Sequence, residues 1–236
     1  MNWWRRLAGS LSRAPRADSE RWVVVDVEAS GLDAHRDRLL AIAGVAVRFS
    51  HGQPRIELAD SFEVTLRQDD TAAAGEAAGA FSALGAVDRA NILLHGTGVG
   101  AQLAGVPPAQ GLEAFRQWVG ESPVVAYHAA FDRILIQRHC QAHLGRRLDN
   151  RWLDLEHVVA LLVPALPDRT LDTAMSHLGI ACPKRHEAAA DTLATADILL
   201  RLWPMAKAQM GGVNDFRAMA RLAAGHRWLR RQGGRF

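Results

Sequence analysis

A buried run that ends in two acids is the feature that most constrains this chain, and residues 21–33 read RWVVVDVEASGLD. The run from Trp22 to Val25 is apolar and rich in β-branched residues, which predicts a buried strand. Asp26 and Glu28 follow, and side chains two apart on a strand point to the same face. Two carboxylates this close raise each other's pKa unless a cation lies between them, and a divalent metal ion with oxygen ligands is the obvious candidate. The alternative is a strand that simply ends in solvent with both acids hydrated.

The composition is that of a globular protein with an arginine-rich basic balance. The chain has 236 residues, of which 49% are hydrophobic and 22% charged, with a formal net charge of +3. Only Lys184 and Lys207 are lysines, so nearly all the positive charge is arginine, which binds phosphate well. This balance is compatible with a nucleic-acid partner, and a biased genome is the alternative source of the arginines.

Three features of the sequence bear on the cellular compartment of the protein: the cysteines, the apolar runs and the N-terminus. Cys140 and Cys182 form no CxxC pair, which favours a reduced compartment, and we expect a cytoplasmic protein. No apolar run approaches the roughly 20 residues needed to cross a bilayer. The N-terminus lacks the apolar core of a signal peptide, so we interpret residues 1–19 as a basic tail. The alternative is a short amphipathic helix that contacts a partner or a membrane surface.

The order of apolar runs predicts an α/β fold. Three runs, at residues 21–28, 39–49 and 56–66, are joined by connections too short for helical crossovers, so we expect an antiparallel meander. Two more strands, parallel and flanked by helices, complete a mixed five-stranded sheet. These strands are expected at 123–127 and 151–155, the helices at about 107–119, 130–144, 156–162, 170–178, 188–203 and 215–229, and a loose connection at 68–90. We expect the domain at 20–205, with a basic C-terminal helix or tail at 206–236.

Two further sites in the chain supply acids that could join Asp26 and Glu28. Asp132 lies in the first turn of a helix that follows a strand, where the helix dipole favours a carboxylate and where open α/β sheets place their sites. Asp191 shares a helix face with buried-type residues, so it needs a partner or a metal. His186 would lie about 140° from Asp191 on a continuous helix, so we expect it in the loop before the helix, folded back over the site.

Together, these residues form a pattern that resembles the DnaQ-like 3′-to-5′ exonucleases, the DEDDh branch of the ribonuclease H-like fold. The resemblance rests on D-x-E at 26–28, on H-A-A-F-D at 128–132, which matches the family's H-N-A-x-F-D in part, and on H-x-A-x-x-D at 186–191. It covers residues 21–203. Outside the motifs, Ile92 to Gly96 resembles the family's I-x-x-H-G segment and Thr195-Ala196 its T-A pair.

The chain departs from the family pattern at three alanines. Ala29 stands where the family commonly has a substrate-contacting threonine, for which Ser30 could substitute in part. Ala129 replaces the usual asparagine of the second motif, and Ala41 replaces a glutamate of the second strand. These changes put the grip on the substrate in doubt but leave the four acids and the histidine in place.

The resemblance implies a two-metal phosphodiester hydrolase. Asp26, Glu28, Asp132 and Asp191 would hold two Mg²⁺ or Mn²⁺ ions, and His186 would act as the general base. The residues expected to contact the substrate are Ala29, Ser30, Gly31, Leu32, His95, His128 and Phe131, although Phe131 fits a core position equally well.

Three functions remain open at this point. The first is a 3′-to-5′ exonuclease on single-stranded or frayed DNA that releases nucleoside monophosphates, either as the proofreading partner of a DNA polymerase or as a free-standing repair enzyme. The second is an exoribonuclease with the same site. The third is a non-catalytic nucleic-acid-binding module, which the altered positions Ala29, Ala41 and Ala129 would fit.

Overall fold

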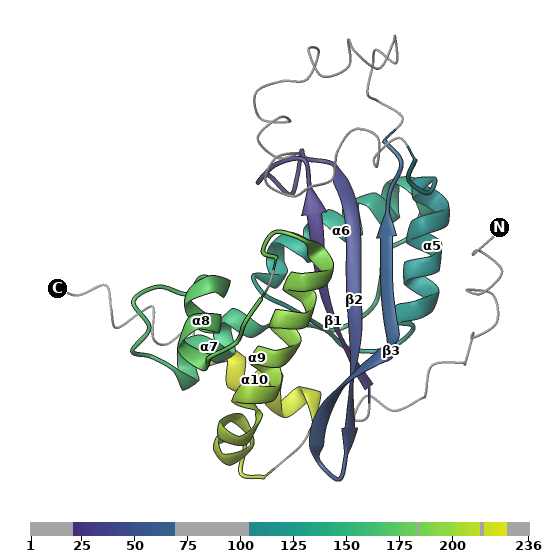
Figure 1. Ribbon diagram of the computed structural model, residues 1–236. Helices are drawn as coiled ribbons and strands as arrows, with labels where there is room; N and C mark the ends of the chain where they lie inside the picture. Colours follow the sequence, from purple (N-terminus) through teal and green to yellow (C-terminus); the bar gives the residue numbers. More distant parts are fainter. Residues whose placement is uncertain (1–20, 69–103, 183, 213–214, 226–236) are drawn as a thin grey trace.

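The computed structural model describes residues 21–68, 104–182, 184–212 and 215–225 (Figure 1). Within them five strands form one sheet, in the order β3-β2-β1-β4-β5. The strands are β1 (Arg21–Ala29), β2 (Leu39–Ser50), β3 (Gln53–Thr65), β4 (Val124–Ala126) and β5 (Trp152–Asp154). The helices are α5 (Pro108–Val119), α6 (Ala129–Leu144), α7 (Leu155–Leu162), α8 (Leu171–Leu178), α9 (Ala188–Gln209) and α10 (Phe216–Ala224).

Strand β1 is the centre of the sheet. It pairs antiparallel with β2 and parallel with β4, while β2 pairs antiparallel with β3 and β4 pairs parallel with β5. The meander and the mixed sheet predicted from the sequence are therefore confirmed. Because β1, β4 and β5 run the same way, their carboxyl ends meet at one edge of the sheet.

The alternation of side chains along β1 divides the core into two layers. Trp22 and Val24 pack with residues of α7, α8, α9 and α10 on one face. Val23, Val25 and Val27 pack with residues of α5 and α6 on the other face. All five side chains are at most 9% exposed, so β1 is buried on both faces, as its continuous apolar run predicted. Figure 1 shows α9 crossing in front of the sheet, with α5 and α6 on the opposite side.

The helices follow the predicted positions, with one clear difference. Helix α9 continues to Gln209 with Pro204 inside it, beyond the predicted end at 203. Proline removes a helical hydrogen bond, but Leu202, Trp203 and Ala206 stay buried across this turn, and their packing keeps the helix intact. The expected connection at 68–90 lies almost wholly outside the described residues, as do His95 and the tail at 1–19.

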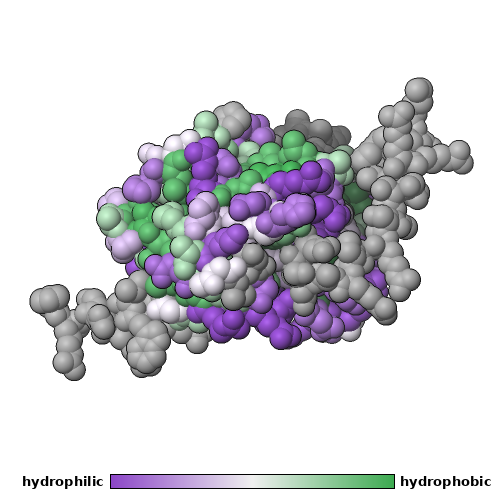
Figure 2. Space-filling model, turned by 90° about the horizontal axis from the view of Figure 1, so that it is seen from below, coloured by the Kyte–Doolittle hydropathy of each residue, from purple (hydrophilic) through white to green (hydrophobic). Residues whose placement is uncertain are grey.

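Among the described residues, no helix is both long and apolar enough to cross a bilayer. Figure 2 views the molecule from below, and hydrophilic and hydrophobic patches alternate over that face.

Candidate active site

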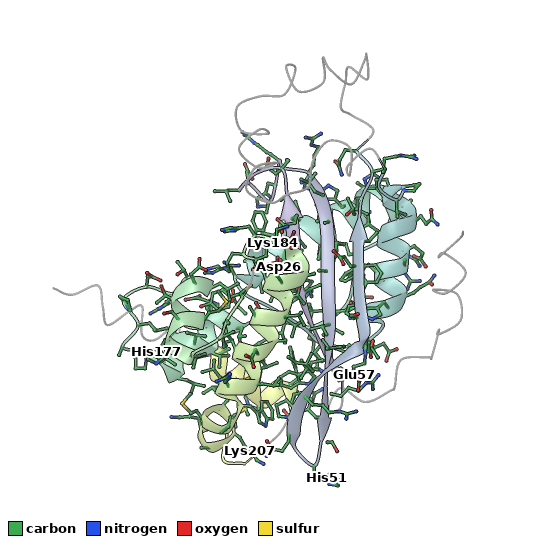
Figure 3. All side chains as sticks on the ribbon, viewed as in Figure 1. Asp26, His51, Glu57, His177, Lys184 and Lys207 are labelled. Atoms are coloured by element: carbon green, nitrogen blue, oxygen red, sulfur yellow. The ribbon has the colours of Figure 1, made fainter. Side chains whose placement is uncertain are left out.

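The two acids of the opening motif lie on the face of the sheet that α9 covers. Asp26 and Glu28 have the same parity along β1 as Trp22 and Val24, which pack against α9. Glu28 is buried, and Asp26 keeps part of its surface accessible. Figure 3 shows Asp26 towards the carboxyl end of β1, far from His51 at the tip of the β2–β3 hairpin.

Asp132 joins them from the second motif. It lies in the first turn of α6 and is only 4% exposed. The pKa of the Asp132 carboxyl is raised to about 8, chiefly by burial and also by the charges of Asp154 and Glu28, while backbone N–H groups of Asp132 and Val27 oppose the shift. Burial and neighbouring carboxylates therefore both disfavour the charged form of Asp132.

The other three predicted acids all lie close enough to Asp26 to affect its pKa. Its pKa is raised well above the usual value by burial and by the charges of Asp132, Glu28 and Asp191, while the charge of Arg185 opposes the shift. The structure therefore brings together the four carboxylates that lie up to 165 residues apart in the sequence (191 − 26). We call Asp26, Glu28, Asp132 and Asp191 the carboxylate quartet.

Asp191 is held by the segment that precedes α9. It is 6% exposed, and one carboxylate oxygen accepts the backbone N–H of His186 at 3.2 Å. The other oxygen forms an ion pair with Arg185, whose guanidinium also contacts Asp172 on α8 at 2.5 Å. His186 precedes the helix, as the sequence predicted, and its backbone lies in the left-handed region with φ 62°.

Both histidines beside the quartet have this unusual backbone conformation. His128, which directly precedes α6, has φ 59°, and its N–H donates to the Asp154 carboxylate at 3.1 Å. Left-handed backbone at non-glycine residues costs of order 1–3 kcal/mol and concentrates at functional sites. The loops that carry His128 and His186 are thus held in strained conformations on both sides of the quartet.

The loop after β1 carries three of the seven predicted substrate contacts. Ser30 is buried, and its hydroxyl accepts the N–H of Arg38 at 2.9 Å and donates to Asp37 at 3.2 Å, so this hydroxyl helps to shape the loop. Gly31 lies so close to Asp37 that an added Cβ would be 2.5 Å from its carboxylate. Leu32 is 96% exposed at the tip of this loop.

The other predicted contacts have mixed surroundings. Ala29 is buried at the end of β1, and Phe131 is partly buried and packs against the core on the α6 side. Ala41 lies opposite Glu28 in the β1–β2 register. Because side chains of directly paired residues lie about 5 Å apart, a glutamate at position 41 would add a fifth carboxylate beside Glu28.

One acidic group beside the quartet was not predicted as a site. Asp154, Glu156 and His157 lie where β5 meets α7, and their potential ligand atoms are within 4.8 Å of one another. We call these residues the β5 cluster. The signal was available in the sequence, because Asp154 ends strand β5 just as Asp132 follows β4, and both strands finish at the same edge of the sheet.

Comparison with known proteins shows that the chain is similar to exonucleases. Residues 97–199 match the RNase_T family model, which is described as "Exonuclease". A "DNA polymerase III PolC-type" of Clostridium perfringens is 27% identical over 185 residues, which cover 76% of this chain and 11% of that protein. A "DNA polymerase III subunit epsilon-like protein" of Rhodobacter capsulatus is 35% identical over 107 residues, which cover 44% of this chain and 15% of that protein. The chain thus spans only a small part of the curated relatives that it matches.

Solved structures show the same fold. E. coli exonuclease I in complex with a dT13 oligonucleotide superposes with a TM-score of 0.60 and 16% identity, over 81% of this chain and 43% of the other. A zinc-bound complex of the E. coli enzyme with single-stranded DNA gives a TM-score of 0.62 and 18% identity, over 79% of this chain and 41% of the other. These structures share the ribonuclease H-like fold that the motifs predicted, and residues 97–199 match an exonuclease family model.

Proposed function

We propose that this protein is a metal-dependent 3′-to-5′ exonuclease that removes nucleoside monophosphates from single-stranded or frayed DNA. The observation that carries the proposal is the convergence of the carboxylate quartet on Asp26, with the pKa values of Asp26 and Asp132 both raised. Buried carboxylates that repel one another are stabilised by a cation of high charge.

The donor set fits hard divalent cations. The four proposed ligands offer only carboxylate oxygens, which suit Mg²⁺ or Mn²⁺. Bound there, two such ions would supply Lewis-acid stabilisation of phosphoryl charge and a lowered pKa for the attacking water. Asp26 and Glu28 would hold them from β1, Asp132 from α6 and Asp191 from α9.

We assign the proton transfer to His186. The attack of water breaks the bond between phosphorus and the 3′ oxygen, which leaves a 3′ hydroxyl on the shortened strand and a 5′ phosphate on the released nucleotide. His186 would accept the proton of that water, since histidine titrates near neutral pH in its ordinary state. The backbone N–H of His186 donates a hydrogen bond to Asp191, which links the position of this loop to a proposed metal ligand.

The terminal nucleotide would meet the two loops beside the quartet. Leu32 is the apolar side chain free to contact an unpaired base, because it is 96% exposed. His128, Phe131, Ala29, Ser30 and Gly31 remain predicted contacts around it, and His95 lies outside the described residues. We favour DNA over RNA because the relatives are named DNA polymerases. The proposed role is proofreading or repair in the cytoplasm, and the proposed protein partner is a DNA polymerase.

The test is digestion of matched oligonucleotides with a label at either end. With Mn²⁺ or Mg²⁺, a 5′-labelled DNA strand should shorten one nucleotide at a time, and a 3′-labelled strand should release its label as a mononucleotide. An RNA strand of the same sequence, digested in parallel, decides between deoxyribonuclease and exoribonuclease. Binding without any cleavage of DNA or RNA would instead support the non-catalytic module and overturn the proposal.

A further inference from the structure

A basic pocket lies outside the quartet, at the free edge of β5. It has a volume of about 630 Å³ and lies between α6, the entrance to β5, and α10. Its lining contains four arginines and two aromatic residues: Arg133, Asn150, Arg151, Trp152, Phe216, Arg217, Ala220, Arg221 and Ala224. We call it the arginine pocket.

The charge of this pocket is poorly compensated. Its lining includes no aspartate or glutamate, and within the described part of the chain Arg133, Arg217 and Arg221 form no ion pair. The adjacent acid Asp215 is engaged at the start of α10, where its carboxylate accepts the N–H of Ala218 at 2.7 Å. By contrast, Arg21 and Arg48 are both matched by Asp60 at 2.8 Å. Clustered like charges repel, so this pocket favours a ligand with several negative charges.

An aromatic contact and the spacing along α10 position three of these arginines. The guanidinium of Arg151 lies over the buried ring of Phe216, 5.0 Å from its centroid. Arg217 and Arg221 are exposed and four residues apart on α10, which puts them on the same face of the helix. One guanidinium group can donate two hydrogen bonds to one phosphate. Several neighbouring arginines therefore suit a chain of phosphates better than a single anion.

Trp152 adds an aromatic side chain to this basic lining. It is partly buried, and its indole N–H is buried without a hydrogen-bond partner in the described residues. Aromatic residues interleaved with arginines are the combination that holds single-stranded nucleic acid, through base stacking and phosphate pairing.

The pocket is formed by elements that also carry the acidic residues. Arg133 directly follows Asp132 of the quartet on α6, and Trp152 lies two residues before Asp154 of the β5 cluster, about 7 Å along the strand. We propose that the arginine pocket binds backbone phosphates of the nucleic-acid strand whose 3′ end lies in the quartet, independently of base sequence. This inference rests on the proposed function for the identity of the ligand as a nucleic acid and for the position of its 3′ end.

The test measures binding without cleavage, by fluorescence anisotropy of a 5′-labelled dT16 strand in EDTA. The double variant Arg217→Gln/Arg221→Gln should weaken binding about tenfold and lower the slope of log affinity against log salt by about 1.4, or 0.7 for each lost phosphate contact. The matched control is Arg55→Gln/Arg201→Gln, which removes two exposed arginines that do not line the pocket. This control should bind dT16 nearly as tightly as the wild type.

Equal losses in the pocket and control variants would overturn the inference, since they would reveal only a general effect of net charge. An unchanged affinity in the pocket variant would overturn it as well. Circular dichroism and melting temperature check that both double variants fold. The result stays separate from the proposed function: a wild type that fails to cleave but whose dT16 binding depends on the pocket refutes the nuclease and supports the pocket.

Discussion

Two groups of acidic residues lie at the same edge of the sheet, and they balance their charge in opposite ways. In the β5 cluster, Asp154 accepts N–H groups from His128 and Glu156, each at 3.1 Å, and begins α7 as its N-cap. Glu156 lies 3.4 Å from Arg169 and 3.5 Å from His157.

The pKa shifts of the two groups differ in the same way. Burial raises the pKa of Asp154, but His157, His128 and the Glu156 amide counter that shift. In the quartet, by contrast, Asp132, Glu28 and Asp191 all add to the raised pKa of Asp26.

Closeness of potential ligand atoms does not by itself mark a cation site. The β5 cluster is the compact group, with its atoms within 4.8 Å of one another, yet it has its own donors. The quartet has more negative charge than its surroundings balance, so an external cation stabilises it more. We therefore expect the metal at the quartet and assign the β5 cluster a supporting role, in which Asp154 fixes the backbone of His128 and the start of α7.

The largest expected effect comes from removing one carboxylate of the quartet. Asp26→Asn should reduce metal-dependent cleavage by about 10³-fold, because it removes part of a metal-binding contribution of several kcal/mol. The matched control is Asp154→Asn in the β5 cluster, whose side chain can still cap α7 and which should keep activity within about tenfold. Cleavage rates on labelled DNA and Mn²⁺ calorimetry measure both. The comparison fails if Asp154→Asn loses metal binding and Asp26→Asn retains it.

The next effect is on stability as a function of pH in the metal-free protein. The pKa of Asp132 is raised to about 8 in the folded state from 3.8, so between these values the folded protein binds more protons than the unfolded chain. Stability must then decrease as pH rises through this interval. The melting temperature in EDTA should be higher at about pH 5.5 than at about pH 8.5. Asp132→Asn should flatten this slope, and saturating Mg²⁺ should reduce it; a slope unchanged in the variant would remove Asp132 as its source.

Much of this comparison could be predicted from particular residues. The continuous apolar run from Trp22 to Val25 predicted a buried strand. The two-residue spacing of Asp26 and Glu28 put both acids on one face, and the motif spacings brought in Asp132 and Asp191. These features are local, or they belong to a family pattern that spans three separate elements. Their catalytic and metal-binding roles stay predictions.

Other features depend on tertiary contacts that no local pattern encodes. The ion pair of Arg185 with Asp172 joins two elements whose relative positions the sequence does not state. The hydroxyl of Ser30 is hydrogen-bonded to Asp37 and Arg38 inside its own loop. The arginine pocket likewise forms only when α10 packs beside β5. The sequence showed an excess of arginine but could not show where the arginines gather.

The smallest expected effect concerns Arg185, the cation that already lies against the quartet. Its guanidinium pairs with Asp191 and Asp172, so a metal ion that binds Asp191 must compete with this contact. Arg185→Gln should therefore tighten Mn²⁺ binding about threefold, which corresponds to less than about 1 kcal/mol for a partly solvated ion pair. Calorimetric titration measures it, with Lys184→Gln as the control because Lys184 pairs with Glu187 in the same segment. Weaker Mn²⁺ binding in Arg185→Gln alone would show instead that Arg185 holds Asp191 in position for the metal, and the quartet would then resemble the β5 cluster in depending on an internal partner.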